Sequence, residues 1–188
     1  LTKTTQNGWY VTGKTSVKRF GDFKSPVYFL TNTGLDSKAF SIRTGLNQYE
    51  RGFNVYYSYI NNEIGILKSS HIGNIKDLID AINSRQPIVV KDFNYAINDP
   101  KQNITHQIAK VDFYKRFQNL GKLEVQYDFQ KNRRFEHDIR VVDDKNKPAI
   151  DLELNSHTIK ANFNFDSNTA KTLKIGMMAS YQNNFANP

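Results

Sequence analysis

The segments 109–117 and 121–130 alternate apolar and polar residues, and this period of two constrains the fold more than any other feature of the sequence. In the second segment the odd positions are apolar and the even ones polar: Leu123, Val125, Tyr127 and Phe129 against Glu124, Gln126, Asp128 and Gln130. In the first, Ala109, Val111, Phe113 and Phe117 alternate with Lys110, Asp112, Tyr114 and Arg116. Because successive side chains of a strand point to opposite sides, the pattern predicts a sheet with one apolar and one charged face. Such an apolar face contacts either the core of a soluble protein or lipid.

The composition favours a sheet that is apolar on one side and hydrated on the other. Hydrophobic residues make up 38% of the 188 residues, below the roughly 45–50% of ordinary soluble domains. Aromatic residues reach 13%, with 13 Phe and 10 Tyr. The length suffices for one domain, and the recurring aromatic and β-branched residues argue against disorder.

Two absences narrow the classes of protein. Without cysteine there is no disulfide, thiolate nucleophile or Cys-based metal site. No apolar run reaches the ~18–20 residues that a transmembrane helix needs. This observation does not exclude a transmembrane β-barrel, because each of its strands gives only a weak signal in the sequence. The chain begins at Leu1 without Met or a signal peptide and ends in a polar, strand-like segment, so we expect a part of a larger protein.

Period-two alternation between turn signals predicts eight strands. They lie near residues 10–20, 26–34, 38–48, 51–66, 106–118, 121–134, 149–165 and 171–183. In the seventh, the apolar positions are even up to Leu154 and odd from Ile159 onward. Either a β-bulge near Ser156–Thr158 restores the phase, or the outer half of this strand projects beyond the lipid, where alternation relaxes.

Short and long connections alternate along the chain. Gln48–Arg51, Asn119–Gly121 and Asp166–Lys171 are short, whereas Leu67–Thr105 and Arg134–Pro148 are long and polar. Outer-membrane barrels combine short periplasmic turns with long extracellular loops. The longest loop also predicts one short helix, because Ile75, Leu78, Ile79 and Ile82 follow helical spacing behind Asn74, a suitable N-cap. We expect this helix to pack on its neighbours rather than to anchor in a membrane.

Catalytic and metal-binding chemistry finds little support. None of the four histidines pairs with another at metal-ligand spacing, and we interpret Glu136-His137-Asp138 as a solvated charged run rather than a metal site. No Gly-rich phosphate loop and no nucleophile elbow is present. Asp151 and Glu153 share one strand face, and without a catalytic partner we expect them to be solvated lumen residues. The sequence therefore predicts neither an enzyme nor a cofactor.

The net charge of +8 suggests nucleic-acid binding as an alternative function. Basic sheets with exposed aromatic residues bind RNA and single-stranded DNA. A stacking platform needs both kinds of residue on one face. Phe113 and Phe117 face away from Lys110 and Arg116, which makes this alternative a minor one. The basic residues fit better as a lumen and loop lining that attracts anions.

Several stretches together resemble the β-barrel of TonB-dependent outer-membrane receptors, nearest to the ferric dicitrate-like iron-complex receptors of Bacteroidetes-type bacteria. They are GDFKSPVYFLTNTG, RGFNVYYSYINNEIGIL, PKQNITHQIAK, GKLEVQYDFQKNRRFEHDIR and KPAIDLEL, within roughly residues 10–183. The resemblance implies an antiparallel up-and-down transmembrane β-barrel in the outer membrane of a Gram-negative bacterium. It also implies uptake of iron–siderophore or similar complexes, powered through TonB. No plug domain or TonB box is recognisable, so residues 1–188 correspond to about eight strands of a barrel of about 22.

On this interpretation the apolar face contacts outer-membrane lipid. Tyr57, Tyr59, Tyr127 and Tyr181 are then expected near strand ends, in interfacial aromatic girdles. The opposite face would line the lumen and pack on the plug, through Lys110, Asp112, Arg116, Glu124, Gln126 and Asp128. The alternatives are a small structural outer-membrane barrel, including a closed eight-stranded one, and a soluble β-sheet binding module whose apolar face packs on a second sheet.

In receptors of this family the ligand is bound by the plug, the inner wall and the extracellular loops. An anionic iron complex favours Arg and Lys for charge and Tyr for stacking or hydrogen bonding. Within the two long loops and the strand ends beside them, the residues with suitable chemistry are Lys91, Tyr95, Arg133, Arg134, His137 and Arg140. The sequence does not name the ligand, and citrate, catecholate, haem and glycan complexes all remain open.

Overall fold

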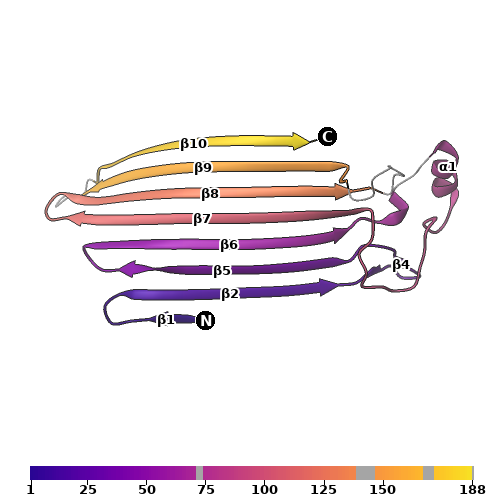
Figure 1. Cartoon of the computed structure of the whole chain (residues 1–188), viewed down its shortest axis with the longest axis horizontal. Helices are drawn as coiled ribbons and strands as arrows, with labels where there is room; N and C mark the ends of the chain where they lie inside the picture. Colours follow the sequence, from indigo (N-terminus) through magenta and orange to yellow (C-terminus); the bar gives the residue numbers. More distant parts are fainter. Residues whose placement is uncertain (71–73, 139–146, 167–171, 188) are drawn as a thin grey trace.

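A single eight-stranded sheet, with every neighbouring pair antiparallel, makes up most of the computed structural model (Figure 1). The structure describes residues 1–70, 74–138, 147–166 and 172–187. The strands lie side by side in the order β1-β2-β5-β6-β7-β8-β9-β10. Their bounds are β1 Thr2–Thr4, β2 Trp9–Phe20, β5 Leu35–Asn47, β6 Arg51–Gly65, β7 Lys101–Phe117, β8 Gly121–His137, β9 Ile150–Phe165 and β10 Lys174–Asn187. The prediction of an all-β, antiparallel fold is therefore confirmed.

The connections separate by length between the two ends of the sheet (Figure 1). Residues 5–8, 48–50, 118–120 and 166–173 connect strands at one end, which we call the short-turn end. Residues 21–34, 66–100 and 138–149 connect strands at the other, which we call the loop end. The predicted segregation of short turns from long loops is confirmed.

The prediction of a long strand at 26–34 is wrong. Only Phe29–Leu30 (β4) is extended there, and it pairs with Phe23–Lys24 (β3) in a separate two-stranded sheet inside the loop. The eighth strand of the main sheet is instead the short β1, which pairs with β2. Residues 26–34 form no strand of the main sheet because β2 pairs directly with β5 along its whole length, which leaves no position between them.

Strand β9 contains no bulge. Its pairing with β8 runs without interruption from Ile150 to Phe165, through Ser156, His157 and Thr158. Leu152 and Leu154 therefore lie on the face opposite to Ile159 and Phe163, and the second explanation of the phase change, relaxed alternation in the outer half, agrees with this register.

The sheet is open in the described part of the chain. The edge strands β1 and β10 each pair with one neighbour, and the two termini lie at opposite edges (Figure 1). The closed eight-stranded barrel is therefore not what this chain forms.

The β7–β8 turn depends on a glycine. Gly121 has φ +146°, a conformation that other residues rarely adopt, and a Cβ placed there would collide with the carbonyl oxygen of Asn164 on β9. Asn119, two residues earlier, has φ 58°, which asparagine tolerates. These two residues let β7 reverse into β8 within three residues.

The loop end contains a 3-10 turn at Lys68–Ser70 and the predicted helix, α1, at Ile75–Asn83. Asn74 is its N-cap, as predicted: the side-chain Oδ1 accepts from the Asp77 amide at 2.9 Å. The expected packing of this helix is not observed, because α1 has no buried residue and Ile75 and Ile82 are 77% and 73% exposed. None of the described helices is both long and apolar enough to cross a membrane.

Replacing Asn74 with alanine removes the hydrogen bond to Asp77 and should weaken α1 by about 1 kcal/mol. Hydrogen exchange of the α1 amides should then accelerate, while the amides of β6 and β7 keep their protection. Asn83→Ala, at the last residue of the same helix, is the matched control, and equal acceleration in both variants would contradict the capping role.

Candidate functional site

One face of the sheet carries a continuous apolar surface, which we call the apolar belt. Directly opposite residues of an antiparallel pair share a face, so the register defines its members: Trp9, Val11, Phe40, Ile42, Leu46, Phe53, Val55, Tyr57, Tyr59, Ala109, Val111, Phe113, Phe117, Leu123, Val125, Tyr127, Phe129, His157, Ile159, Ala161, Phe163, Phe165, Ile175, Met177, Ala179 and Tyr181. One row of paired residues, for example, runs from Phe53 through Phe113 to Val125. The predicted apolar face is thus continuous from β2 to β10.

The apolar belt is uncovered. Val111, Phe113 and Met177 are 45%, 43% and 75% exposed, and in the described part of the chain no aliphatic or aromatic side chain other than Pro100, at the loop end, is buried. A soluble sheet protein of this size hides its apolar face against a second layer. The stacked second sheet that the soluble alternative requires is not found among the described residues.

Aromatic residues gather at both borders of the apolar belt, with aliphatic residues between them. At the loop-end border they are Phe40, Tyr57, Tyr59, Phe129, His157 and Tyr181, and at the short-turn border Trp9, Phe53, Phe113, Phe117, Phe163 and Phe165. Neighbouring rings are in contact: the Phe40 and Tyr59 centroids are 5.7 Å apart, and those of Trp9 and Phe53 5.5 Å. The four tyrosines named from the sequence lie at or beside the loop-end border, although in mid-strand rather than near strand ends.

The apolar belt crosses the rows of paired residues obliquely. Phe40 on β5 and Tyr59 on β6 are paired, but the same row continues into Gln107 and Lys131. At the other border Arg51 on β6 lies in the row that reaches Leu123 and Phe163. Both borders therefore shift in the same direction along the sheet. A flat apolar slab that meets tilted strands produces this offset, since the strands of a barrel tilt by about 35–45°.

The height of the apolar belt is close to that of a bilayer core crossed by strands. From His157 to Phe165 the chain extends about 26 Å at about 3.3 Å per residue. Tilted strands reduce this to about 20 Å along the normal, near the ~25 Å apolar band of outer-membrane barrels.

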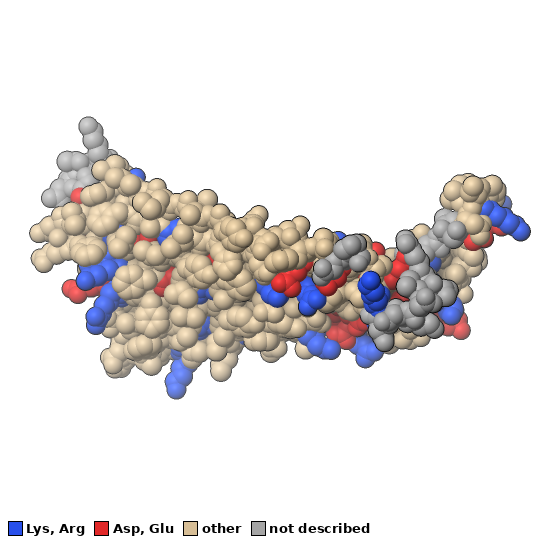
Figure 2. Space-filling view, turned by 45° about the horizontal axis from the view of Figure 1, so that its top comes forward, with Lys and Arg blue, Asp and Glu red and all other residues tan. Residues whose placement is uncertain are grey.

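Beyond its loop-end border the same face becomes charged, and we call its four described ion pairs of 3.4 Å or less the loop-end rim. The pairs are Asp36–Lys38 (3.4 Å), Glu63–Lys101 (2.9 Å), Glu153–Lys131 (2.9 Å) and Asp151–Arg133 (3.1 Å). Figure 2 shows acidic and basic atoms side by side in the half of the molecule nearer α1. The Lys131 ammonium and the Asn155 amide, which hydrogen-bond to Glu153, hold the pKa of that carboxyl below its usual range. The register places Asp151 and Glu153 on the belt face, and not on the polar face to which the sequence assigned them.

The opposite face is polar. Lys110 is paired with Asp128 and Asp112 with Gln126, while Glu124 lies one layer nearer the short-turn end, so the predicted charged face is confirmed. Two adjoining hollows of about 400 Å³ and 410 Å³ open on this face and share Lys14, Ser41 and Tyr56. Arg43, in the second hollow, lies 5.2 Å from the centre of the Tyr56 ring.

Lys14, Arg43 and Tyr56 were not among the residues singled out from the sequence. Alternation along each strand shows which residues lie on the polar face, but only the pairing between strands places Thr12, Arg43 and Tyr56 in one row. Arg43 over Tyr56 and Lys122 over Tyr114 also show that cations and aromatic rings do meet on the polar face. The prediction from Phe113 and Lys110, that aromatic and basic residues lie on opposite faces, therefore does not hold for the whole sheet.

At the loop end, three segments meet around Asn32, and three of the four buried polar side chains of the described residues gather here. Asp22, Thr31 and Asn32 are 7%, 6% and 4% exposed. Asp22 Oδ1 accepts from the Asn32 and Thr33 amides at 2.7 and 3.0 Å. Its buried carboxylate therefore fixes the turn in which Asn32 takes φ 68°.

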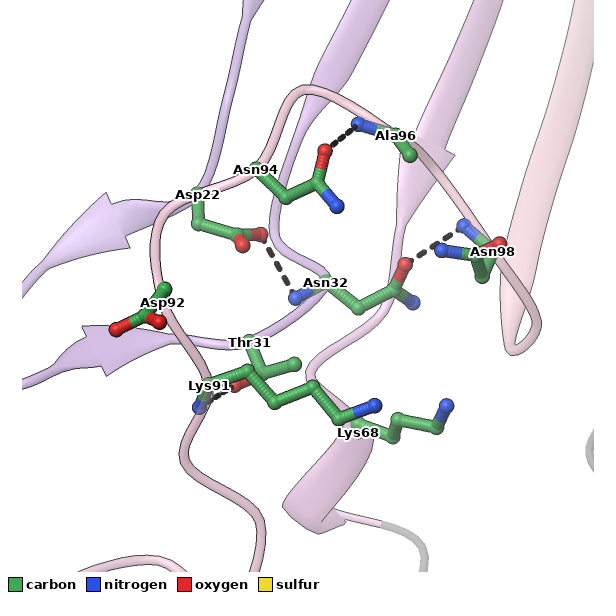
Figure 3. A pocket seen from close by; sticks show the side chains of 9 residues that line it. All are labelled: Asp22, Thr31, Asn32, Lys68, Lys91, Asp92, Asn94, Ala96 and Asn98. Atoms are coloured by element: carbon green, nitrogen blue, oxygen red, sulfur yellow. Dashed lines mark hydrogen bonds between the residues drawn. The ribbon is translucent and has the colours of Figure 1, made fainter.

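Asn32 uses its whole side-chain amide to bind the other two segments, and Figure 3 shows the bond to Asn98. Its Nδ2 donates to the carbonyl oxygens of Ile66 and Pro100, both at 2.9 Å. Its Oδ1 accepts from the Asn98 amide at 2.8 Å. The Asp22 carboxylate and the Asn32 side-chain amide, which together we call the Asn32 knot, thus bind loop backbone groups, so their first role is structural.

Lys91 lies beside this knot and lines a hollow of about 90 Å³ (Figure 3). The other lining residues are Asp22, Thr31, Asn32, Lys68, Asp92, Asn94, Ala96 and Asn98. Ligand pockets usually measure about 300–1,000 Å³, so this hollow is too small for an iron complex. Tyr95 lies outside it, 51% exposed, with its ring 4.9 Å from Phe93 and 5.5 Å from the Arg19 guanidinium.

The structure does not bring the predicted arginine pair together. Arg133 is on the belt face, held by Asp151 through two hydrogen bonds of 3.2 and 3.1 Å, whereas Arg134 is on the polar face and donates to Glu136 at 3.0 Å. Adjacent strand residues point to opposite sides, so the two do not share a site. His137 ends β8, and Arg140 lies outside the described residues.

No group of three His, Asp or Glu side chains in the described part of the chain is arranged to hold a metal ion. Comparison with known proteins adds no assignment: no family model, no curated protein and no solved structure matches this chain.

Proposed function

We propose that this chain is a wall segment of an outer-membrane β-barrel, with the apolar belt in lipid and the polar face toward the lumen. The observation that carries the proposal is the uncovered belt itself, bordered by aromatic residues on both sides. Exposing this surface to water is costly at about 25 cal/mol per Å², whereas a bilayer solvates it. The oblique course of the belt and the separation of short turns from long loops support the same conclusion.

Within this class, we propose a TonB-dependent receptor that imports iron–siderophore or similar complexes. Its support is the resemblance of the sequence stretches to those receptors and the chemistry of the polar face. Lys14, Arg43 and Tyr56 together offer charge, a guanidinium fork and a phenol to an anionic complex or to a plug domain. The plug, TonB and the ligand are the partners this function requires.

The ligand contacts follow from the two faces. Arg134 is on the polar face and is the member of the arginine pair that a ligand in the lumen reaches. Arg133 is on the belt face, engaged with Asp151, and faces away from the lumen. Lys91, Tyr95 and His137 lie at the loop end, where an extracellular ligand first meets the wall.

Spin-label scanning of β8 tests the wall assignment. Single cysteines at positions 123–130 of the full-length protein, reconstituted in lipid, receive a nitroxide whose collisions with oxygen and with a water-soluble nickel chelate are measured. We expect oxygen to dominate at Leu123, Val125, Tyr127 and Phe129, because lipid dissolves oxygen and excludes the chelate. The chelate should dominate at Glu124, Gln126 and Gln130.

The alternatives predict different outcomes. If the labels at the odd and the even positions are all protected from oxygen and from the chelate, a second layer covers the apolar belt, as in a soluble module. The belt could also be exposed to lipid in a protein that binds no ferric citrate, catecholate, haem or glycan complex. That result would exclude the receptor and favour a structural outer-membrane barrel.

A further inference from the structure

The charges on the belt face differ between its two borders. At the loop-end rim every acidic side chain has a basic partner at 2.9–3.4 Å. At the short-turn border, Arg51 and Lys115 face each other directly across β6 and β7. Neither makes an ion pair with another described residue, and residues 167–171 of the sequence contain no Asp or Glu.

Two like charges directly opposite on a strand pair repel each other. Both residues are exposed, and Glu50 in the adjoining turn makes no ion pair with either. The Lys115 ammonium lies 5.3 Å from the centre of the Phe117 ring, which offsets part of its charge. The pair is thus a cationic position without a counter-ion among the described residues.

The surroundings identify the kind of anion. Phe53 and Phe113 form the next paired row toward the belt, and Leu123 follows Lys115 in its own row. Long basic side chains in such a place lay their stems on apolar surface and extend the charge into the polar layer. Arginine binds phosphate through its planar fork and lysine as a point charge, while the apolar neighbours suit acyl chains rather than a free ion.

We infer that Arg51 and Lys115 bind the phosphate of an anionic phospholipid at the short-turn border of the apolar belt. The inference rests on the proposed function, because it requires the belt to lie in a bilayer. Basic residues near an anionic lipid surface each contribute attraction that salt weakens. The site therefore selects phosphatidylglycerol over phosphatidylcholine, most strongly at low ionic strength.

The test measures lipid binding to the full-length protein by native mass spectrometry, with phosphatidylglycerol and phosphatidylcholine as probes. In Arg51→Gln/Lys115→Gln we expect the apparent affinity for phosphatidylglycerol to fall about tenfold, toward that for phosphatidylcholine. Arg51→Lys/Lys115→Arg retains both charges and should retain the preference. Lys38→Gln/Lys131→Gln removes two cations from the loop-end rim and is the matched control, which should change the preference little.

A nitroxide at Val125 in the same proteins separates the two proposals. If this label is exposed to water in membranes, the wall assignment fails. If the label lies in lipid but Arg51→Gln/Lys115→Gln binds phosphatidylglycerol as tightly as the parent, only the lipid site is overturned. Equal binding of inorganic phosphate, in competition with the lipid, would overturn it too, by showing a site for free anions.

Discussion

An arginine in place of Val125 should lower the stability of the membrane-inserted protein by about 2–4 kcal/mol, the cost of a basic residue on the lipid face near mid-bilayer. Val125 lies between Phe113 and Ala161 in the middle of the apolar belt, so a guanidinium there cannot reach either border without distortion. The measurement is urea-induced unfolding of the full-length protein in lipid vesicles.

Gln126→Arg is the matched control for this experiment. Gln126 is the next residue of β8 and lies on the polar face between Asp112 and Lys160. Because water or a hydrated partner solvates that face, we expect a change within about 0.5 kcal/mol. Equal losses in the two variants would contradict the assignment of the faces to lipid and lumen.

Replacing Asn32 with alanine should release the loops at the loop end. The substitution removes three hydrogen bonds and places alanine at φ 68°. The carbonyls of Ile66 and Pro100 each lose a donor, and Pro100 keeps only the Ile66 amide as its partner. At about 1 kcal/mol for each bond, the local opening free energy should fall by about 3 kcal/mol. Hydrogen exchange at Asn98 should then accelerate by about a hundredfold, and proteases should cut residues 85–100 faster.

Asn98→Ala provides the comparison for Asn32. Asn98 lines the same hollow but joins the knot through its backbone amide, which alanine keeps. Exchange at the strands should be unchanged in both variants, because the knot binds loops to one another. If Asn98→Ala accelerates exchange and proteolysis of the loops as much as Asn32→Ala does, the Asn32 side chain does not hold the loops together.

The sequence by itself determined seven of the eight strands of the main sheet, the two faces and the loop helix. These features depend on periods of two and 3.6 residues and on one capping side chain, and all three are local properties of the chain. The alternation of Leu123, Val125 and Phe129 with polar neighbours identified the apolar face, and Asn74 marked the start of α1. The same alternation places the adjacent residues Arg133 and Arg134 on opposite faces, so their assignment to one site was inconsistent with the pattern of the strand.

Only the tertiary structure decided how distant segments align. The pairing of Phe40 with Tyr59, and of that row with Gln107 and Lys131, shows that the borders of the apolar belt form one oblique band. Pairing also placed Arg51 opposite Lys115, 64 residues later, and kept β9 free of a bulge. Single-strand periodicity decides which residues share a face, but not which residue of the next strand lies opposite each of them. Turn geometry and the backbone hydrogen bonds between strands decide that alignment. The Asn32 knot was hidden for the same reason, since its partners at Ile66, Asn98 and Pro100 are backbone groups that any residue provides.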